Sequence, residues 1–151
     1  MLELLAPAGN LDAVIAAVQN GADAVYMGFG DGFNARRSAD NFTRESFAKA
    51  VRYCHIRGCK VYVTLNTLVG DREMEAAAAL AQQASDAGAD AILVQDLGLA
   101  RVLRDALPDI PLHASTQMSI HDLAGVEAAA EMGITRAVLS RELSLEQIRF
   151  I

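Results

Sequence analysis

The chain has 151 residues, of which 52% are apolar, and its formal net charge is −6. This length suits one domain with a sizeable core, and no stretch approaches the roughly 18 unbroken apolar residues of a membrane span. The negative net charge argues against a chain that binds nucleic acid by itself, because nonspecific binding needs a basic face.

The first 28 residues predict a strand, a helix and a second strand. The apolar run Glu3–Ala6 is closed by the turn signal Pro7-Ala8-Gly9, and Asn10 is suited to cap the helix that follows. Gly21 is expected to end that helix, and Ala24–Met27 forms the next strand. A strand, a helix and a strand in this order form a βαβ unit, whose two strands are parallel.

The same alternation continues along the chain. Four more strands are expected after helices that stop at a glycine or a proline, namely Gly58–Val63, Gly88–Leu93, Pro111–Ser115 and Gly133–Leu139. The residues expected to begin or cap the later helices are Thr43, Asp71, Asp96, Thr116 or Ser119, and Ser144 with Gln147 as a capping box. Six strands alternating with about six helices predict an α/β fold with a parallel sheet.

Two architectures use this alternation: an open doubly wound sheet, which suits 151 residues, and a βα-barrel, which normally takes about 250 residues. Alternate strand residues point to opposite faces. One face is apolar, and the other carries Tyr26, Tyr62, Thr64, Asn66, Gln95, His113, Ser115 and Gln117. We therefore predict a parallel, TIM-barrel-like fold, present as about the first six βα units of an eight-stranded barrel.

Polar residues gather where the expected strands end, which is where barrel active sites lie. The catalytic candidates are Asn66, Asp96, His113, Gln117 and Arg141, and the substrate-binding candidates are Arg36, Tyr62, Thr64, Gln95, Ser115, Thr116 and Glu142. Helix capping is the alternative role for Asp96 and Thr116. His113 is an acid or base, or a satisfied interior histidine. Arg141 binds an anion or pairs with Glu142.

The connection Phe29–Phe42 is longer than the usual two to six residues, which is typical of a binding loop. Arg36 and Arg37 within it and Arg44 beside it suit a phosphate or a carboxylate, and solvated side chains are the alternative. No motif for a metalloprotease or a serine hydrolase occurs, and no metal-ligand cluster is expected.

Cys54 and Cys59 lack the C-x-x-C spacing, so we expect idle thiols in a reducing cytoplasm. The N-terminus has no signal-peptide pattern.

Several motifs together resemble the N-terminal region of the U32 peptidase family, the collagenase-like protease family. They are Glu3–Asn10, Gly21–Tyr26, Asn34–Arg36 with Asn41–Phe42, Tyr62–Thr67, His113–Gln117 and Ser140–Glu146. The resemblance implies a βα-barrel catalytic domain in a longer protein. Residues 1–151 are then expected to be its N-terminal portion, without the family's later cysteines.

The resemblance also implies an activity. Family members resemble oxygen-independent hydroxylases that act on tRNA or rRNA bases or on a ubiquinone precursor, with an iron–sulfur cluster held by the later cysteines. The RNA-acting branch depends on prephenate. The resemblance also implies that Asn66, Asp96, Gln117, Arg141 and Arg36 are site residues.

Two alternatives stay open: a genuine peptidase that hydrolyses collagen-like peptides, and a non-catalytic scaffold fragment. The expected partner of the full-length protein is RNA or a small molecule. Because six strands do not close a barrel, we also expect this portion, inactive alone, to self-associate through its bare sheet edges.

Overall fold

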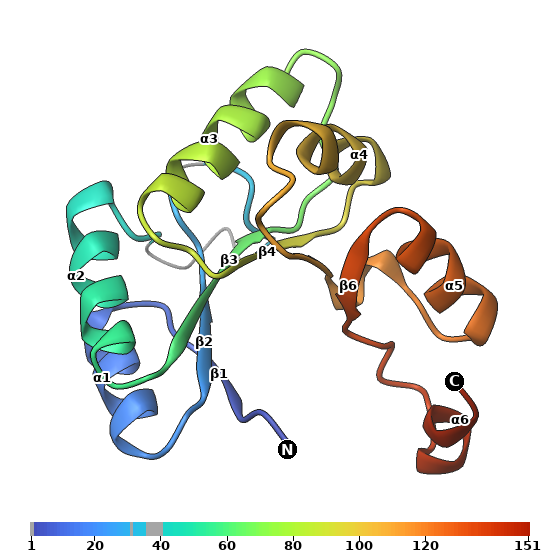
Figure 1. The fold of residues 1–151 in the computed structure, drawn as a ribbon, viewed down its shortest axis with the longest axis horizontal. Coiled ribbons are helices and arrows are strands. Elements are labelled where there is room, and N and C mark those ends of the chain that lie inside the picture. Colours follow the sequence, from blue (N-terminus) through green and yellow to red (C-terminus); the bar gives the residue numbers. More distant parts are fainter. Residues whose placement is uncertain (1, 31, 36–40) are drawn as a thin grey trace.

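A computed structural model describes residues 2–30, 32–35 and 41–151. One six-stranded sheet runs through this part of the chain, with all neighbouring strands parallel and in the order β1-β2-β3-β4-β5-β6. Figure 1 shows helices α1 to α5 along the outer side of the curved sheet, and the short α6 apart from it. A sheet whose spatial order equals its chain order has no switch point, so the fold is TIM-barrel-like rather than doubly wound.

The elements alternate as the sequence predicts. The strands are β1 Leu5–Pro7, β2 Ala24–Met27, β3 Lys60–Leu65, β4 Ala91–Val94, β5 Leu112–Ala114 and β6 Ile134–Ala137. The helices are α1 Leu11–Gln19, α2 Arg44–His55, α3 Met74–Asp86, α4 Leu97–Ala106, the 3-10 turn η1 Thr116–Met118, α5 Leu123–Glu131 and α6 Leu145–Phe150. In the described parts of the chain, none of these helices combines the length and apolar character needed to cross a lipid bilayer.

Most predicted helix caps are confirmed. Asn10, Thr43, Asp96 and Ser144 each accept a hydrogen bond from a backbone N–H in the first turn of their helix. Ser144 also forms the predicted capping box with Gln147. These side chains satisfy donors that the helix itself leaves free.

Two predicted helix starts are wrong. Asp71 does not open α3, because Gly70 to Glu73 form a turn in which Glu73 N–H donates to Gly70 O (2.8 Å) before the helix begins. Neither Thr116 nor Ser119 caps α5. Asp122 takes that position, since its carboxylate accepts from Gly125 N–H at 2.7 Å.

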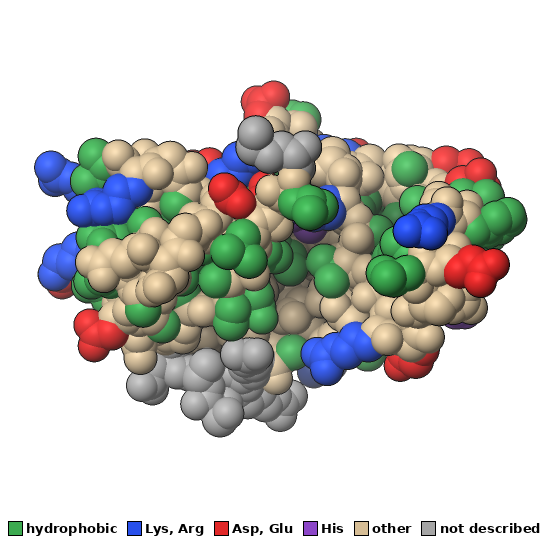
Figure 2. All heavy atoms as spheres, turned by 90° about the horizontal axis from the view of Figure 1, so that it is seen from below, with side chains coloured by type: hydrophobic (Ala, Val, Ile, Leu, Met, Phe, Trp, Pro, Cys, Tyr) green, Lys and Arg blue, Asp and Glu red, His purple; other side chains and the backbone are tan. Residues whose placement is uncertain are grey.

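The two faces of the sheet differ as predicted. The outer face packs under the helices in two apolar clusters, one around β4, β5 and α4 and the other around β2, β3 and α2. A smaller cluster on the inner face joins Ala24, Tyr62, Ala91 and Leu93 with Leu5 and Tyr26. Figure 2 looks toward this concave side from below, and apolar side chains lie in its middle beside a few charged ones. The inner face therefore surrounds a hollow instead of lying beneath a second helical layer.

We predict that the 151-residue chain self-associates. In the described residues β1 and β6 each pair with one neighbour, so each has an unpaired outer edge that can template another strand. Light scattering is expected to give a mass above that of the monomer, falling on dilution. A monodisperse monomer at all concentrations would contradict this.

Candidate active site at the carboxyl ends of the strands

A cavity of about 230 Å³ lies at the carboxyl ends of the strands on the inner face. We call it the strand-end pocket. It is lined by Leu5, Tyr26, Ala35, Thr64, Asn66, Leu93, Ser115, Thr116, Gln117, Val138 and Arg141. Six of the predicted site residues are in this set, and they come from three different strand ends. The curvature of the sheet therefore brings together polar residues that are up to 77 positions apart, from Thr64 to Arg141.

Asn66, just beyond β3, connects two walls of the strand-end pocket. Its Oδ1 accepts a hydrogen bond from Ala35 N–H at 3.1 Å, and its Nδ2 donates to Ser115 Oγ at 3.3 Å. Ser115 Oγ also accepts from Gln117 N–H at 3.4 Å, which begins the turn η1. One amide side chain thus fixes both the loop after β2 and the end of β5.

The loop after β2 is closed at its base by backbone and side-chain hydrogen bonds. Phe42 N–H donates to Gly28 O (3.0 Å), and Asn34 Nδ2 donates to Asn41 Oδ1 (3.1 Å). A Cβ atom at Gly28 would lie 2.1 Å from Asn41 Oδ1, so a larger residue at this position would have to displace this amide pair. The closed base holds Ala35 at the wall of the strand-end pocket.

Arg141 and Gln117 are the exposed members of the pocket lining. Arg141 forms no ion pair with any described residue. The predicted alternative, an ion pair with Glu142, is therefore wrong. A guanidinium that has no ion-pair partner in the described part of the chain and lies beside a polar pocket suits an anionic group such as a phosphate or a carboxylate.

The other predicted site residues lie elsewhere. Asp96 is engaged by backbone donors, since Oδ1 accepts from Leu99 N–H (2.8 Å) and Oδ2 accepts from Val69 N–H (3.3 Å). Gln95 is half-buried and Glu142 is exposed, and neither lines the strand-end pocket. Arg36 falls outside the described residues.

Tyr62 and His113 belong to a network below the strand-end pocket that sequence reasoning missed. The Tyr62 hydroxyl donates to the Glu3 carboxylate at 3.0 Å, and Arg136 forms an ion pair with the same carboxylate. The His113 ring packs edge-on against the Tyr62 ring, with 4.9 Å between the ring centres. Lys60 Nζ lies 3.8 Å from Glu3 Oε2. Arg136 stands beside His113 in the register of β5 and β6. The feature of the sequence that could have indicated this network is Arg136, a charged residue on the polar face of an expected strand.

The network changes the acidity of its members. The hydrogen bond from Arg136 holds the pKa of Glu3 below its usual range, although burial opposes this. Burial and the hydrogen bond to Glu3 raise the pKa of Tyr62. Burial, helped by the charge of Arg136, lowers the pKa of His113 from 6.5 to about 4. Near neutral pH His113 is therefore uncharged, and Glu3 and Arg136 carry opposite charges.

We predict a pH dependence of stability that comes from His113. Its pKa is 6.5 in the unfolded chain and about 4 in the folded protein. The unfolded state therefore binds more protons between these values, and stability is lost as the pH falls through this window. The expected loss is about 3 kcal/mol at roughly 1.4 kcal/mol per pKa unit. Urea unfolding at pH 7, 5.5 and 4.5 measures it.

The matched control is His121, which is exposed and lies outside the network. His113→Gln is expected to flatten the dependence on pH, whereas His121→Gln keeps it. If His113→Gln does not fold, NMR titration of His113 in the unchanged protein measures the same shift. A midpoint near pH 6.5 in the folded state would contradict the prediction.

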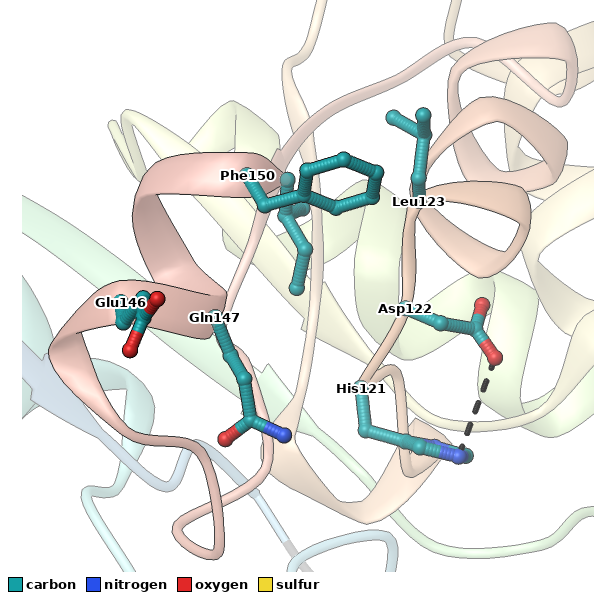
Figure 3. A pocket seen from close by; sticks show the side chains of 7 residues that line it. His121, Asp122, Leu123, Glu146, Gln147 and Phe150 are labelled. Atoms are coloured by element: carbon teal, nitrogen blue, oxygen red, sulfur yellow. Dashed lines mark ion pairs between the residues drawn. The ribbon is translucent and has the colours of Figure 1, made fainter.

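A second cavity, of about 440 Å³, lies between α6 and the start of α5. Figure 3 shows Phe150 directed toward Leu123, and Gln147 toward His121. His121 Nε2 is 3.8 Å from Asp122 Oδ2. None of the predicted site residues lines this cavity, and it is separate from the strand-end pocket.

The iron–sulfur cluster that the resemblance implies does not fit the residues described. Such clusters usually need four cysteine thiolates. Cys54 and Cys59 are both buried and free, and burial raises the pKa of Cys54 to about 12, which disfavours the thiolate. Within the described ranges no three His, Cys, Asp or Glu residues are grouped so that they could hold a metal ion.

The strand order and the position of the pocket define the class of protein: a βα-barrel type of domain with its candidate site at the carboxyl ends of the strands. A family model described as "Peptidase family U32" matches residues 9–151. The chain therefore belongs to peptidase family U32. The structure of a U32 peptidase aligns with a TM-score of 0.74 at 16% identity, covering 92% of this chain and 58% of that chain, which supports the fold.

Curated relatives carry different names. The chain is 43% identical to the 23S rRNA 5-hydroxycytidine C2501 synthase of Escherichia coli over 99% of its length, but this is 22% of that protein. It is 39% identical to tRNA hydroxylation protein P1 of Bacillus subtilis, covering 97% of this chain and 35% of that protein. A collagenase of Porphyromonas gingivalis is 33% identical, covering 99% of this chain and 35% of that protein. The chain thus spans between about a fifth and about a third of these relatives.

Proposed function

We propose that the full-length protein hydroxylates a base of tRNA or rRNA, with residues 1–151 as the N-terminal portion of its catalytic barrel. The observation that carries this proposal is the 43% identity to the rRNA 5-hydroxycytidine synthase over 99% of the chain. The similarity to tRNA hydroxylation protein P1 points to the same type of reaction on another RNA. An RNA substrate is consistent with a cytoplasmic protein.

The strand-end pocket is the proposed binding site for the target base. Enzymes that modify a base usually extrude it from its stack and read its edge by hydrogen bonds. Asn66 and Gln117 offer amide donors and acceptors, and Tyr26 offers an aromatic ring in the same lining. The volume of about 230 Å³ lies below the roughly 300 Å³ at which pockets for drug-sized ligands begin, so a single ring is the expected occupant.

The charges of residues 1–151 suit one anionic group at the strand-end pocket, but not the backbone of an RNA. Arg141 lies at this pocket without an ion-pair partner among the described residues, so it is suited to the phosphate of the target nucleotide or to an anionic co-substrate. Prephenate, which the resemblance implies, would be such an anion. The net charge of −6 means that affinity for the RNA backbone has to come from outside residues 1–151. We likewise propose that residues outside 1–151 hold the iron–sulfur cluster.

Nucleoside analysis of RNA tests the proposal. A strain without the gene is expected to lose one hydroxylated base from tRNA or rRNA, as measured by mass spectrometry of digested RNA. The full-length gene should restore it. If RNA is unchanged and ubiquinone precursors accumulate instead, the substrate is a quinone precursor, and the RNA proposal is wrong.

Peptide hydrolysis is the second candidate, favoured by the similarity to the collagenase of Porphyromonas gingivalis. Gelatin turnover by the purified full-length protein that disappears in Gln117→Ala would support it. Gln117 is exposed in the pocket lining, so this variant is expected to fold normally. If strand-end pocket variants change neither RNA modification nor gelatin turnover, this region is a non-catalytic scaffold.

A further inference from the structure

We propose that Asn34 and Asn41 are positioning residues that fix the orientation of the Asn66 amide in the strand-end pocket. This inference rests on the proposed function, because it takes that pocket as the place where the target base binds. Asn34 and Asn41 belong to the loop after β2, and Asn66 follows β3. We call the three residues the asparagine network.

The asparagine network is a continuous series of hydrogen bonds. Asn34 Nδ2 donates to Asn41 Oδ1 at 3.1 Å, which joins two parts of the loop after β2. The residue that follows Asn34 is Ala35, whose N–H donates to Asn66 Oδ1 at 3.1 Å. Asn66 Nδ2 in turn donates to Ser115 Oγ at 3.3 Å. The series therefore reaches from the loop after β2 to the end of β5.

The amide pair of Asn34 and Asn41 lies directly against the backbone at the end of β2. A Cβ atom at Gly28 would lie 2.1 Å from Asn41 Oδ1 and 2.3 Å from Asn34 Nδ2. Two backbone hydrogen bonds hold the next residue of the loop at the same place, since Phe42 N–H donates to Gly28 O (3.0 Å) and Gly30 N–H donates to Phe42 O (3.1 Å). The sheet itself therefore determines where the amide pair sits.

The strands that carry the asparagine network lie inside the sheet. β2, β3 and β5 each pair with a neighbouring strand on both sides within the described residues. Further strands of the expected full-length barrel join the sheet at β1 and β6, so they leave these pairings as they are. We therefore expect the same network in the full-length protein.

The asparagine network gives Asn66 a defined donor and a defined acceptor. A carboxamide has two N–H donors and two lone pairs on its oxygen. The bonds to Ala35 N–H and Ser115 Oγ use one of each, and the second N–H and the second lone pair are left for a ligand. An amide of fixed orientation can distinguish base edges by their order of donors and acceptors. Asn34 and Asn41 act on this amide through Ala35, and neither of them lines the strand-end pocket.

Hydrogen exchange of the full-length protein tests the asparagine network without any enzymatic activity. Gly28→Ala places a methyl group where the amide pair lies, and it adds no backbone strain because Gly28 is not in the left-handed region. We expect exchange at Ala35 N–H to become about tenfold faster, since the loop no longer holds this donor against Asn66. Mass spectrometry of peptide fragments that contain Ala35 measures it. Exchange as slow as in the unchanged protein would overturn the proposal.

Gly9→Ala is the matched control for this substitution. Gly9 lies just beyond β1, and its backbone is not left-handed either. Among the described residues, no atom beyond its chain neighbours lies within 4 Å of a Cβ built there. Gly9→Ala should leave exchange at Ala35 N–H unchanged. Equal acceleration in Gly9→Ala and Gly28→Ala would overturn the proposal, because general loosening of this end of the barrel would then explain both.

Kinetics of the full-length protein give the second test. Asn41→Ala and Gly28→Ala are each expected to raise KM for the RNA substrate about tenfold, with a smaller change in kcat, because a misoriented Asn66 amide weakens binding of the base. Both substitutions break the same amide pair, so the double variant should again show a rise of about tenfold and not of about 100-fold. Asn41→Asp keeps an oxygen acceptor for Asn34 Nδ2 and should stay close to the unchanged protein.

The two proposals fail in different ways. If the unchanged protein hydroxylates no RNA, the proposed function is wrong, and the asparagine network is decided by hydrogen exchange alone. If the unchanged protein is active, an unchanged KM in Asn41→Ala overturns the assignment of Asn34 and Asn41 as positioning residues. Effects of Asn41→Ala and Gly28→Ala that multiply in the double variant overturn it as well, because the two substitutions would then act independently.

Discussion

Leu103→Ala is expected to lower the free energy of unfolding by about 3 kcal/mol, within the range of roughly 2–5 kcal/mol for such changes. Leu103 lies on α4, is 0% exposed and belongs to the cluster that joins α4 to β4 and β5. Its neighbours in that cluster include Ile92 and Leu112, which are fixed in the sheet and cannot follow the shortened side chain. The loss therefore contains both the transfer of the removed atoms and the cavity they leave.

The adjacent residue provides the control. Val102 is on the same helix but is 36% exposed. Val102→Ala is therefore expected to cost less than about 1 kcal/mol, because the atoms removed are partly in water already. Urea unfolding of both variants measures the difference. Equal losses at the two positions would mean that α4 does not pack on the sheet as described.

Asn66→Ala is expected to reduce the RNA hydroxylation that we propose for the full-length protein at least about 100-fold, the scale typical when groups that orient a substrate are misplaced. The variant removes the hydrogen bonds to Ala35 N–H and to Ser115 Oγ at once. It also leaves a half-buried backbone donor without a partner, which costs about 1–3 kcal/mol. The loop after β2 and the end of β5 are then no longer held at a fixed separation.

Two variants separate this effect from a general loss of folding. Asn66→Asp retains Oδ1 as the acceptor for Ala35 N–H but loses the donor to Ser115, so an intermediate activity is expected. Asn20→Ala removes an exposed asparagine side chain whose Nδ2 donates to Ala16 O near the end of α1, and it should leave activity unchanged. A folded Asn66→Ala protein with full activity would remove Asn66 from the candidate site.

The candidate site was predictable in composition but not in arrangement. Strand alternation placed Thr64, Asn66 and Ser115 on the polar inner face, and all three line the strand-end pocket. The same reasoning grouped Asp96 with them, but its carboxylate is occupied by two backbone donors instead. A polar residue after a strand serves equally well as a cap or as a ligand, and spacing does not distinguish the two.

The sequence by itself determined the elements and their order, because caps, helix stripes and strand alternation depend on residues within a few positions of one another. Asn10, Thr43 and Ser144 begin their helices as predicted for this reason. Only the tertiary structure decided that Glu3 meets Arg136, 133 positions away, and that Asn66 joins Ala35 to Ser115. Such contacts depend on how strongly the whole sheet curves, and that curvature is set by the packing of all the strands and helices together.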